Sequence, residues 1–497
     1  MIIQMSYKQQ HTDIKQIIAK PTDYVGKIVT ICGWIKTFRA GKKNSLGFCK
    51  LNDGTCVEQL QILFDKSLLA ENHKTYFDQI FEKATTGVSL KVIGPIVPSP
   101  KAEQPVELQA HSYEILGDVK DPETYPIAKT ELGLDFLRTV PHLRVRTDTF
   151  ASVNRIKSVM KLAFAEYFDQ LGFHEVQVPL ITDNECESGA NPFTVTTVLG
   201  DGKVSGLPVK ADDKNAIDFH ADFFRKRTYL TVSGQLHLET LALALQKVWT
   251  MTTAFRAEPS TTRVHAAEFW MLELEFCFCT LEDNMKVNEG AIKYCIKKVL
   301  EKCRSELVFL QNKFDPTLIQ RLEKYASVPF IVTTHEKCIK QMLQDEADGK
   351  VKFEKSPKFD DDIGKEHEKY ITDVMFGGMP VFVCFFPFEC KAFYMPIVNE
   401  NEPIKRVSGF DLLMPNGAGE VVGGSQRETD YNKLIEKMEI KGINPKSLEF
   451  YSDLRKYGTV PHGGSGIGFD RLVMLMTSLD NIRDTSPFAR TYEMCYF

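Results

Sequence analysis

The sequence contains no apolar run close to the roughly 20 residues that a membrane-spanning helix requires. Its first 20 residues include no Arg and no long apolar core, which argues against a secretory signal or a typical transit peptide. The 12 Cys follow no regular spacing, and Cys277 and Cys279 are separated by a single residue, a poor geometry for a disulfide or a zinc site. These absences favour a cytoplasmic protein with reduced thiols.

A strong excess of either charge is missing as well, because 61 Lys and Arg stand against 66 Asp and Glu, for a net charge of −5. Composition alone therefore suggests no nucleic-acid partner, and a basic binding surface would have to be local. The 43% of hydrophobic and 26% of charged residues are ordinary for a soluble globular protein. A length of 497 residues favours more than one domain.

The most informative stretch runs from Thr250 to Phe276. Its two ends are rich in β-branched and aromatic residues or alternate at period two, which predicts two strands joined by a polar loop. Arg256 and Glu258 share one face, because neighbouring side chains of a strand point to opposite faces. The second strand places four side chains on one face: Phe269, Met271, Glu273 and Glu275. This set suits a nucleoside triphosphate, although an amphipathic hairpin with solvated charges fits the periodicity equally well.

The same stretch, with the pattern Phe-Arg-x-Glu, loop, His-x-x-Glu-Phe, resembles motif 2 of the class II aminoacyl-tRNA synthetases of the aspartyl, asparaginyl and lysyl subgroup. The Gly-rich segment 463–472 resembles motif 3, and Phe150–Ile181 resembles motif 1, a long helix followed by the strand Glu175–Ile181. The resemblance extends from about residue 25 to the end of the chain. It implies an α+β protein with an N-terminal OB-fold β-barrel and a catalytic domain whose antiparallel β-sheet is flanked by helices.

The predicted domains follow from this resemblance and from local signals. Short strands at 25–38, 47–51, 57–64 and 88–96, separated by turn signals, suit a small barrel, so residues 1–116 are expected to form an OB-fold anticodon-binding domain. The polar stretch 117–146 is interpreted as a linker or hinge. Residues 147–497 would form the catalytic domain, with an insertion near 201–227. By the motif 1 resemblance, its first helix and strand would make a homodimer interface.

In the barrel, the resemblance assigns three residues to the anticodon. Phe48 would stack on a base, Gln61 would read a base edge, and Arg39 would hold backbone or base, as OB-folds do with single-stranded nucleic acid. From the residues alone, Phe48 would be a core residue, and the resemblance favours the binding role.

The reaction that the resemblance implies has two steps. ATP and L-asparagine form an aminoacyl-adenylate with release of pyrophosphate, and the acyl group then passes to tRNA(Asn) with release of AMP. Such chemistry needs aligned phosphates and charge neutralisation rather than a protein nucleophile. Arg256 and Arg471 would be the catalytic cations. The ATP-binding residues would be Arg256, Glu258, His265, Phe269, Glu420 and Arg471, and Asp411 and Glu420 would hold Mg²⁺ on the phosphates.

The amino-acid site is assigned by the same resemblance to Glu187, Gln235, Glu273 and Arg427. Leu238 occupies the place of a Lys in aspartate enzymes, and Glu273 that of an Asp, so both favour asparagine. One departure concerns the motif 2 loop: Val264 stands where an Arg usually precedes His265, and Arg263 is one residue earlier.

Three alternatives remain. The first is an aspartyl-tRNA synthetase, discriminating or non-discriminating, against which Leu238 argues. The second is a tRNA-binding paralogue without activity, against which the complete catalytic set argues. The third is a tRNA-independent asparagine synthetase, which the OB-like N-terminus does not fit.

Overall fold

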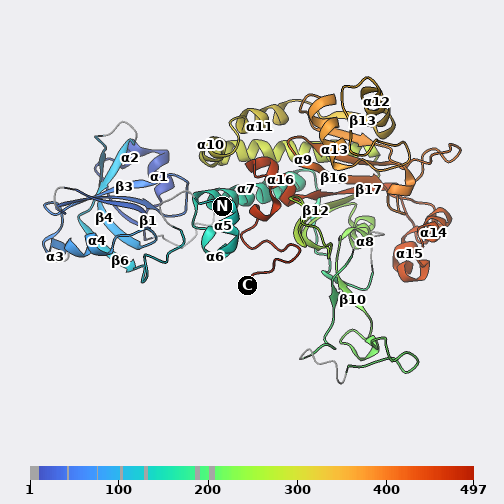
Figure 1. The fold of residues 1–497 in the computed structure, drawn as a ribbon, viewed down its shortest axis with the longest axis horizontal. Helices are drawn as coiled ribbons and strands as arrows, with labels where there is room; N and C mark the ends of the chain where they lie inside the picture. The colour runs from blue at the N-terminus through green and yellow to red at the C-terminus, as the bar shows by residue number, and fades with distance from the viewer. Residues whose placement is uncertain are drawn as a thin grey trace. The chain divides into compact units, whose positions relative to one another are not determined.

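A computed structural model describes residues 10–41, 44–74, 77–100, 104–127, 132–184, 191–200 and 207–497. The chain forms two compact units. One unit comprises residues 1–155 and 304–313, and the other comprises residues 156–303 and 314–497. Figure 1 shows the fold with its element labels.

The first unit contains a closed β-barrel. Its strands follow the order β1-β2-β3-β5-β4, β1 pairs with β4 to close the barrel, and β6 adds to the far edge of β4. Burial alternates along the strands, as it does in a barrel with one face on the core. In β3, Leu60, Ile62 and Phe64 are buried, and the residues between them are half-buried. The predicted strands are confirmed. Their bounds are β1 (Ile28–Gly41), β2 (Leu46–Asn52), β3 (Leu60–Asp65), β4 (Ser89–Pro98), β5 (Val106–Gln109) and β6 (Ser112–Gly117).

Short helices accompany the barrel and the segment that was interpreted as a linker. Two of them lie within 117–146, the stretch that the sequence predicts to be a linker or hinge. The helices are α1 (Ile14–Ala19), α2 (Pro21–Tyr24), α3 (Glu71–Lys74), α4 (Phe77–Lys83), α5 (Leu134–Thr139), α6 (Pro141–Arg144) and α10 (Arg304–Lys313). The domain boundaries drawn from the sequence remain predictions.

The second unit is built on an eight-stranded sheet of order β13-β14-β15-β16-β17-β12-β11-β7. All neighbours from β14 to β11 are antiparallel, and the pairs at the two edges, β13 with β14 and β11 with β7, are parallel. The sheet expected from the sequence is therefore confirmed, with two parallel edges. Its strands are β7 (His174–Glu175), β11 (Lys247–Phe255), β12 (Glu268–Cys277), β13 (Ile331–Thr334), β14 (Val381–Cys384), β15 (Gly409–Met414), β16 (Gly419–Gln426) and β17 (His462–Gly468).

Helices cover this sheet. α9 packs against β16 and β17, α16 against β12, and α8 against β11 and β12. A capping box of Thr280 and Asp283 fixes the start of α9. The helices of this part are α7 (Asp148–Gln170), which begins in the first unit, and α8 (Gln235–Leu245), α9 (Leu281–Lys302), α11 (Leu318–Ser327), α12 (His335–Ala347), α13 (Lys365–Lys369), α14 (Tyr431–Ile440), α15 (Glu449–Lys456) and α16 (Phe469–Thr477).

The predicted strand Glu175–Ile181 is wrong in its middle. The structure has the two-residue strands β7 and β8 (Ile181–Thr182) at its ends, and residues 176–180 continue as irregular chain. Pro179 accounts for this break, because proline has no N–H to give to a sheet ladder. The predicted long helix before it is confirmed as α7.

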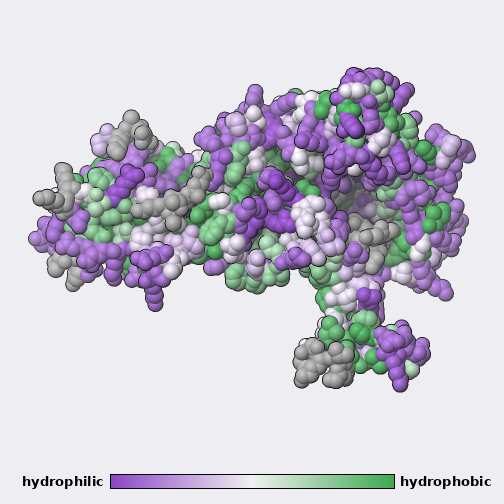
Figure 2. All heavy atoms as spheres, viewed as in Figure 1, coloured by the Kyte–Doolittle hydropathy of each residue, from purple (hydrophilic) through white to green (hydrophobic). Residues whose placement is uncertain are grey.

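A small sheet of β8, β10 (Thr228–Leu230) and β9 (Thr194–Val195) supports the described part of the predicted insertion. Figure 1 shows this segment extending away from the eight-stranded sheet. Residues 207–227 contain the 3-10 helix Phe219–Ala221. Figure 2 shows hydrophobic side chains on the surface of this segment, where Phe223 is 75% exposed. Across the described residues, every helix is too short or too polar to span a membrane.

Candidate active site

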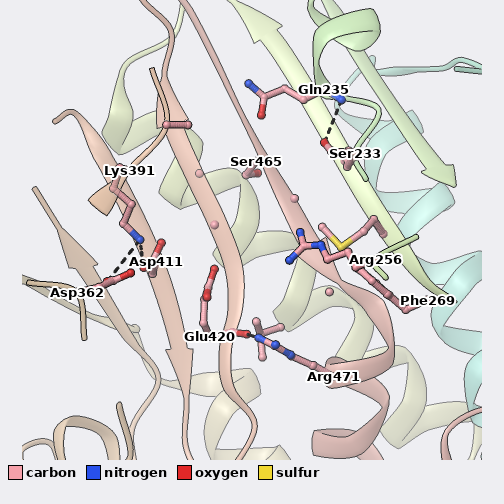
Figure 3. A pocket seen from close by; sticks show the side chains of 18 of the residues that line it. Ser233, Gln235, Arg256, Phe269, Asp362, Lys391, Asp411, Glu420, Ser465 and Arg471 are labelled. Atoms are coloured by element: carbon pink, nitrogen blue, oxygen red, sulfur yellow. Dashed lines mark hydrogen bonds and ion pairs between the residues drawn. The ribbon is translucent and has the colours of Figure 1, made fainter. Parts of the chain in front are cut away.

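A cavity of about 710 Å³ opens on the second unit, over strands β12, β15, β16 and β17. The predicted hairpin supplies one wall through β12 and the loop that follows β11, and β15 and β16 supply the opposite one (Figure 3). Of the predicted nucleotide, metal and amino-acid residues, the following line this cavity: Gln235, Arg256, Glu258, His265, Phe269, Glu273, Asp411, Glu420, Arg427 and Arg471. Glu187 lies outside the described residues.

Cations and an aromatic ring gather at one end of the cavity. Arg256 directly follows β11, and its guanidinium lies 5.5 Å from the centre of the Phe269 ring. Arg471 projects from the first turn of α16 and donates from Nη1 to the Glu420 carbonyl oxygen at 2.6 Å. Burial, together with the charge of Arg471, lowers the pKa of His265. This end can therefore hold a polyphosphate and a stacked base.

The two predicted metal ligands lie over a bare glycine. A Cβ on Gly423 would be 3.2 Å from Oε1 of Glu420 and 3.9 Å from Oδ1 of Asp411, so both carboxylates reach into the space that this glycine leaves open. Burial raises the pKa of Asp411 to about 7, with Glu420 adding to the shift and a neighbouring lysine opposing it. Burial also acts on Glu420, but the cations around it, first Lys391 and then Arg471, lower its pKa.

Lys391, which the sequence did not single out, supplies the cation at this acidic pair. Its Nζ lies 2.6 Å from Oδ2 of Asp411 and 3.9 Å from Oδ1 of Asp362 (Figure 3). Within the described ranges, no cluster of three or more His, Cys, Asp or Glu side chains could enclose a metal by itself. Two carboxylates fit Mg²⁺, which keeps waters and substrate phosphates as its other ligands.

The other end of the cavity is shaped by buried carboxylates. Glu273 on β12 accepts the Gly234 N–H at 3.0 Å and the Ser233 hydroxyl, so it is fixed at the start of α8. Arg427 donates from Nε to Glu275 at 3.3 Å and from Nη2 to the same carboxylate. Burial raises the pKa of Glu275 to about 7, although Arg427 opposes the shift. A guanidinium and carboxylates thus surround the space that the predicted amino-acid residues line.

A glycine of β17 makes room for one of these buried carboxylates. A Cβ on Gly464 would fall 2.1 Å from Cδ of Glu275, so only glycine lets this carboxylate lie across the strand. Gly464 therefore leaves room for the carboxylate that pairs with Arg427.

Two sequence interpretations need correction or completion. Leu238 does not face the cavity: it is fully buried in a cluster with Val178, Ala242, Val248 and Cys277, because an apolar side chain without a polar partner packs into the core. Arg263 of the motif 2 loop points to the surface and pairs with Asp480 at 2.5 Å, whereas Val264 lines the cavity.

The three predicted anticodon residues share one face of the barrel. Arg39 is the cross-strand partner of Phe48, and Lys50, two residues after Phe48 on β2, is the partner of Gln61. Cross-strand partners and alternate residues point to the same side of a sheet. Phe48 is 40% exposed, and Gln61 donates from Nε2 to Glu107 at 2.7 Å. This face combines an exposed aromatic ring, a cation and an amide.

Comparison with known proteins agrees with this geometry. Residues 134–492 match the family described as tRNA synthetases class II (D, K and N), and residues 29–116 match the OB-fold nucleic acid binding domain. The chain is 41% identical to an asparagine–tRNA ligase of Treponema denticola over 95% of this chain and 97% of that protein. It is 38% identical to that of Borreliella burgdorferi, covering 97% of this chain and 99% of the relative. The chain belongs to the asparagine–tRNA ligase family.

Solved structures of this family show the same fold. Asparaginyl-tRNA synthetase from Pyrococcus horikoshii, complexed with asparaginyl-adenylate, matches with a TM-score of 0.82 and 30% identity over 98% of this chain and all of that chain. The synthetase from Entamoeba histolytica, also in complex with asparaginyl-adenylate, matches with a TM-score of 0.76 and 28% identity over 95% of this chain and 96% of that chain.

The sequence patterns alone did not identify some of the residues around the cavity. Lys391 follows a short 3-10 helix, and nothing in its local pattern points to the acid on β15 with which it pairs. Glu275 was placed on the correct strand face by period-two alternation, but its pairing with Arg427 was not foreseen. Glu239, buried beneath Gln235, carried no sequence signal beyond its position in a helix.

Proposed function

We propose that this chain catalyses the ATP-dependent ligation of L-asparagine to tRNA(Asn) through an asparaginyl-adenylate, with release of pyrophosphate and AMP. The observation that carries the proposal is the cavity itself, which joins a cationic end bearing Arg256, Phe269 and Arg471 to a polar end bearing Glu273 and Arg427. One end suits ATP, and the other offers both a donor and acceptors to a side-chain amide.

Charge neutralisation is the main task of the protein in the first step. When the asparagine carboxylate attacks the α-phosphorus, negative charge grows on the phosphate oxygens, and pyrophosphate leaves with the electron pair of the broken P–O bond. Arg256 would stabilise the α-phosphate, and Arg471 would stabilise the leaving phosphates together with His265. Mg²⁺, when held by Asp411 and Glu420, would add further positive charge at the phosphates.

The side-chain amide is recognised by hydrogen bonds of both kinds. Arg427 donates to the amide oxygen, and Glu273 accepts from the amide nitrogen. The carboxylate of aspartate would face Glu273 as a like charge in a partly desolvated site, which is costly. This argument favours asparagine over aspartate as the substrate, and it does not depend on Leu238.

The tRNA would be held through the barrel, where Phe48 stacks on an anticodon base and Arg39 and Gln61 contact the same strand. We further propose a cytoplasmic homodimer. α7 carries Leu162, which is 65% exposed although it is apolar, and an isologous contact through this helix would cover it. Sedimentation of a fully active monomer would overturn the dimer.

The direct test of the function is charging of a tRNA(Asn) transcript with radiolabelled asparagine. We expect ATP-dependent label in acid-precipitable RNA, and AMP and pyrophosphate in equal amounts. Asparagine-dependent pyrophosphate exchange without any charging of tRNA would refute the ligase and support a tRNA-independent enzyme.

A further inference from the structure

A buried carboxylate lies directly beneath the polar end of the cavity. Glu239 has no exposed surface, and it follows Gln235 by one helical turn on α8. Gln235 lines the cavity, whereas Glu239 does not. Residues four apart on a helix lie on the same face, so the first can touch substrate while the second supports it from below.

Glu239 accepts hydrogen bonds from four different side chains. Its Oε1 accepts from Nε2 of Gln235 at 3.0 Å and from the Tyr451 hydroxyl at 2.8 Å. Its Oε2 accepts from Nη2 of Arg455 at 2.9 Å and from Nε2 of His462 at 3.1 Å. A fully buried carboxylate is costly unless such partners surround it.

The same carboxylate reaches the arginine of the amino-acid site. Oε1 of Glu239 lies 3.7 Å from Nε of Arg427, and the same guanidinium pairs with Glu275. Burial alone would raise the pKa of Glu239, but Arg455, His462 and Arg427 together lower it, so the group stays ionised. Arg427 therefore contacts two carboxylates, and the ionised Glu239 offsets part of its positive charge.

We propose that Glu239 is a positioning residue that sets the preference for asparagine over aspartate, by holding the Gln235 amide in place and by offsetting, with Glu275, the positive charge of Arg427. This inference rests on the proposed function. A neutral amide oxygen needs only a hydrogen bond from Arg427, which the offset guanidinium still gives. A carboxylate would need net positive charge at Arg427, and the ionised Glu239 reduces that charge.

The test replaces Glu239 by Gln, which keeps size and shape but removes the negative charge. ATP–pyrophosphate exchange is then measured with asparagine and with aspartate. Because hydrogen bonds to charged groups are at stake, we expect kcat/KM for asparagine to fall roughly 10- to 100-fold, mainly through a higher KM for asparagine. The KM for ATP should stay unchanged, and the ratio of kcat/KM for asparagine to that for aspartate should fall roughly tenfold or more.

The matched control is Glu428→Gln. Glu428 is also buried and accepts from Nζ of Lys437 at 2.7 Å, but it does not line the cavity and does not contact Gln235 or the Arg427 guanidinium. It should lower thermal stability without changing the asparagine-to-aspartate ratio. Tyr451→Phe, which removes one donor to Glu239, serves as a milder second variant should Glu239→Gln fail to fold, and it should lower the ratio in the same direction.

The outcomes separate this inference from the function on which it rests. Loss of discrimination in Glu239→Gln or Tyr451→Phe, but not in Glu428→Gln, supports the positioning role. Equal loss with both amino acids, at an unchanged ratio, would show that Glu239 is only structural and would overturn the inference alone. If the unaltered protein supports exchange with aspartate but not asparagine, the proposed function fails and this inference fails with it.

Discussion

Replacing Phe48 with Ala should weaken tRNA charging while sparing adenylate formation. The ring is 40% exposed on the face that it shares with Arg39 and Gln61, so it offers a surface on which a base can stack. A stacked base contributes about 1–3 kcal/mol, which corresponds to a loss of roughly 5- to 100-fold in kcat/KM for tRNA(Asn). A fully buried Phe→Ala change costs about 3–5 kcal/mol of folding stability, and this partly exposed ring should cost less.

Two further substitutions at the same position separate stacking from packing. Phe48→Leu keeps an apolar side chain but removes the π face, so it should restore thermal stability and not charging. Phe48→Tyr keeps the ring and should restore charging. Charging of a tRNA(Asn) transcript and ATP–pyrophosphate exchange are measured for all three variants. The reasoning is refuted if exchange falls as much as charging, or if Leu rescues charging as well as Tyr does.

Three other predictions concern the second unit. Arg256→Ala should reduce pyrophosphate exchange roughly 100-fold or more, as loss of a charge-stabilising donor does. Arg263→Ala, on the surface of the same loop, should exchange at near the unaltered rate. Normal exchange in Arg256→Ala would contradict the assignment of Arg256 to the α-phosphate. Asp411→Asn should raise the Mg²⁺ concentration for half-maximal exchange roughly tenfold or more, and an unchanged Mg²⁺ titration would remove Asp411 from the metal site. Burial and Arg406 lower the pKa of His335 to about 4 in the folded protein, below its unfolded value of roughly 6.5. The free energy of unfolding should therefore fall as pH drops through that window, by about 2 kcal/mol at pH 5. The fall in melting temperature between pH 7 and pH 5 should be smaller in His335→Gln.

Period-two alternation predicted the part of the site that lies on regular strands. Phe269, Met271, Glu273 and Glu275 were assigned to one face of a strand, and all four line the cavity. The inference succeeds because side-chain direction in a strand depends only on whether a residue is odd or even. It fails where the strand breaks, as it does around Pro179.

Resemblance placed residues in the chain but not always in space. Leu238 matches a pocket position of aspartate enzymes, yet the structure packs it into the core, because only a polar side chain gains by reaching the cavity. Lys391 and Asp411 lie 20 residues apart and on different elements, and Glu239 and His462 lie 223 apart. Contacts of this kind depend on tertiary packing, for which one sequence carries no local signal.

The measurement that tests the central claim most directly is kcat/KM for asparagine and for aspartate in ATP–pyrophosphate exchange by the unaltered protein. In the proposed site Glu273 faces the amide nitrogen, and Glu275 and Glu239 offset Arg427. The carboxylate of aspartate would therefore meet a like charge at Glu273 and little net positive charge at Arg427. A site built around polar partners of its substrate can discriminate by about 10⁴ without editing. The account predicts a preference for asparagine of this order, and comparable values for the two amino acids would contradict it.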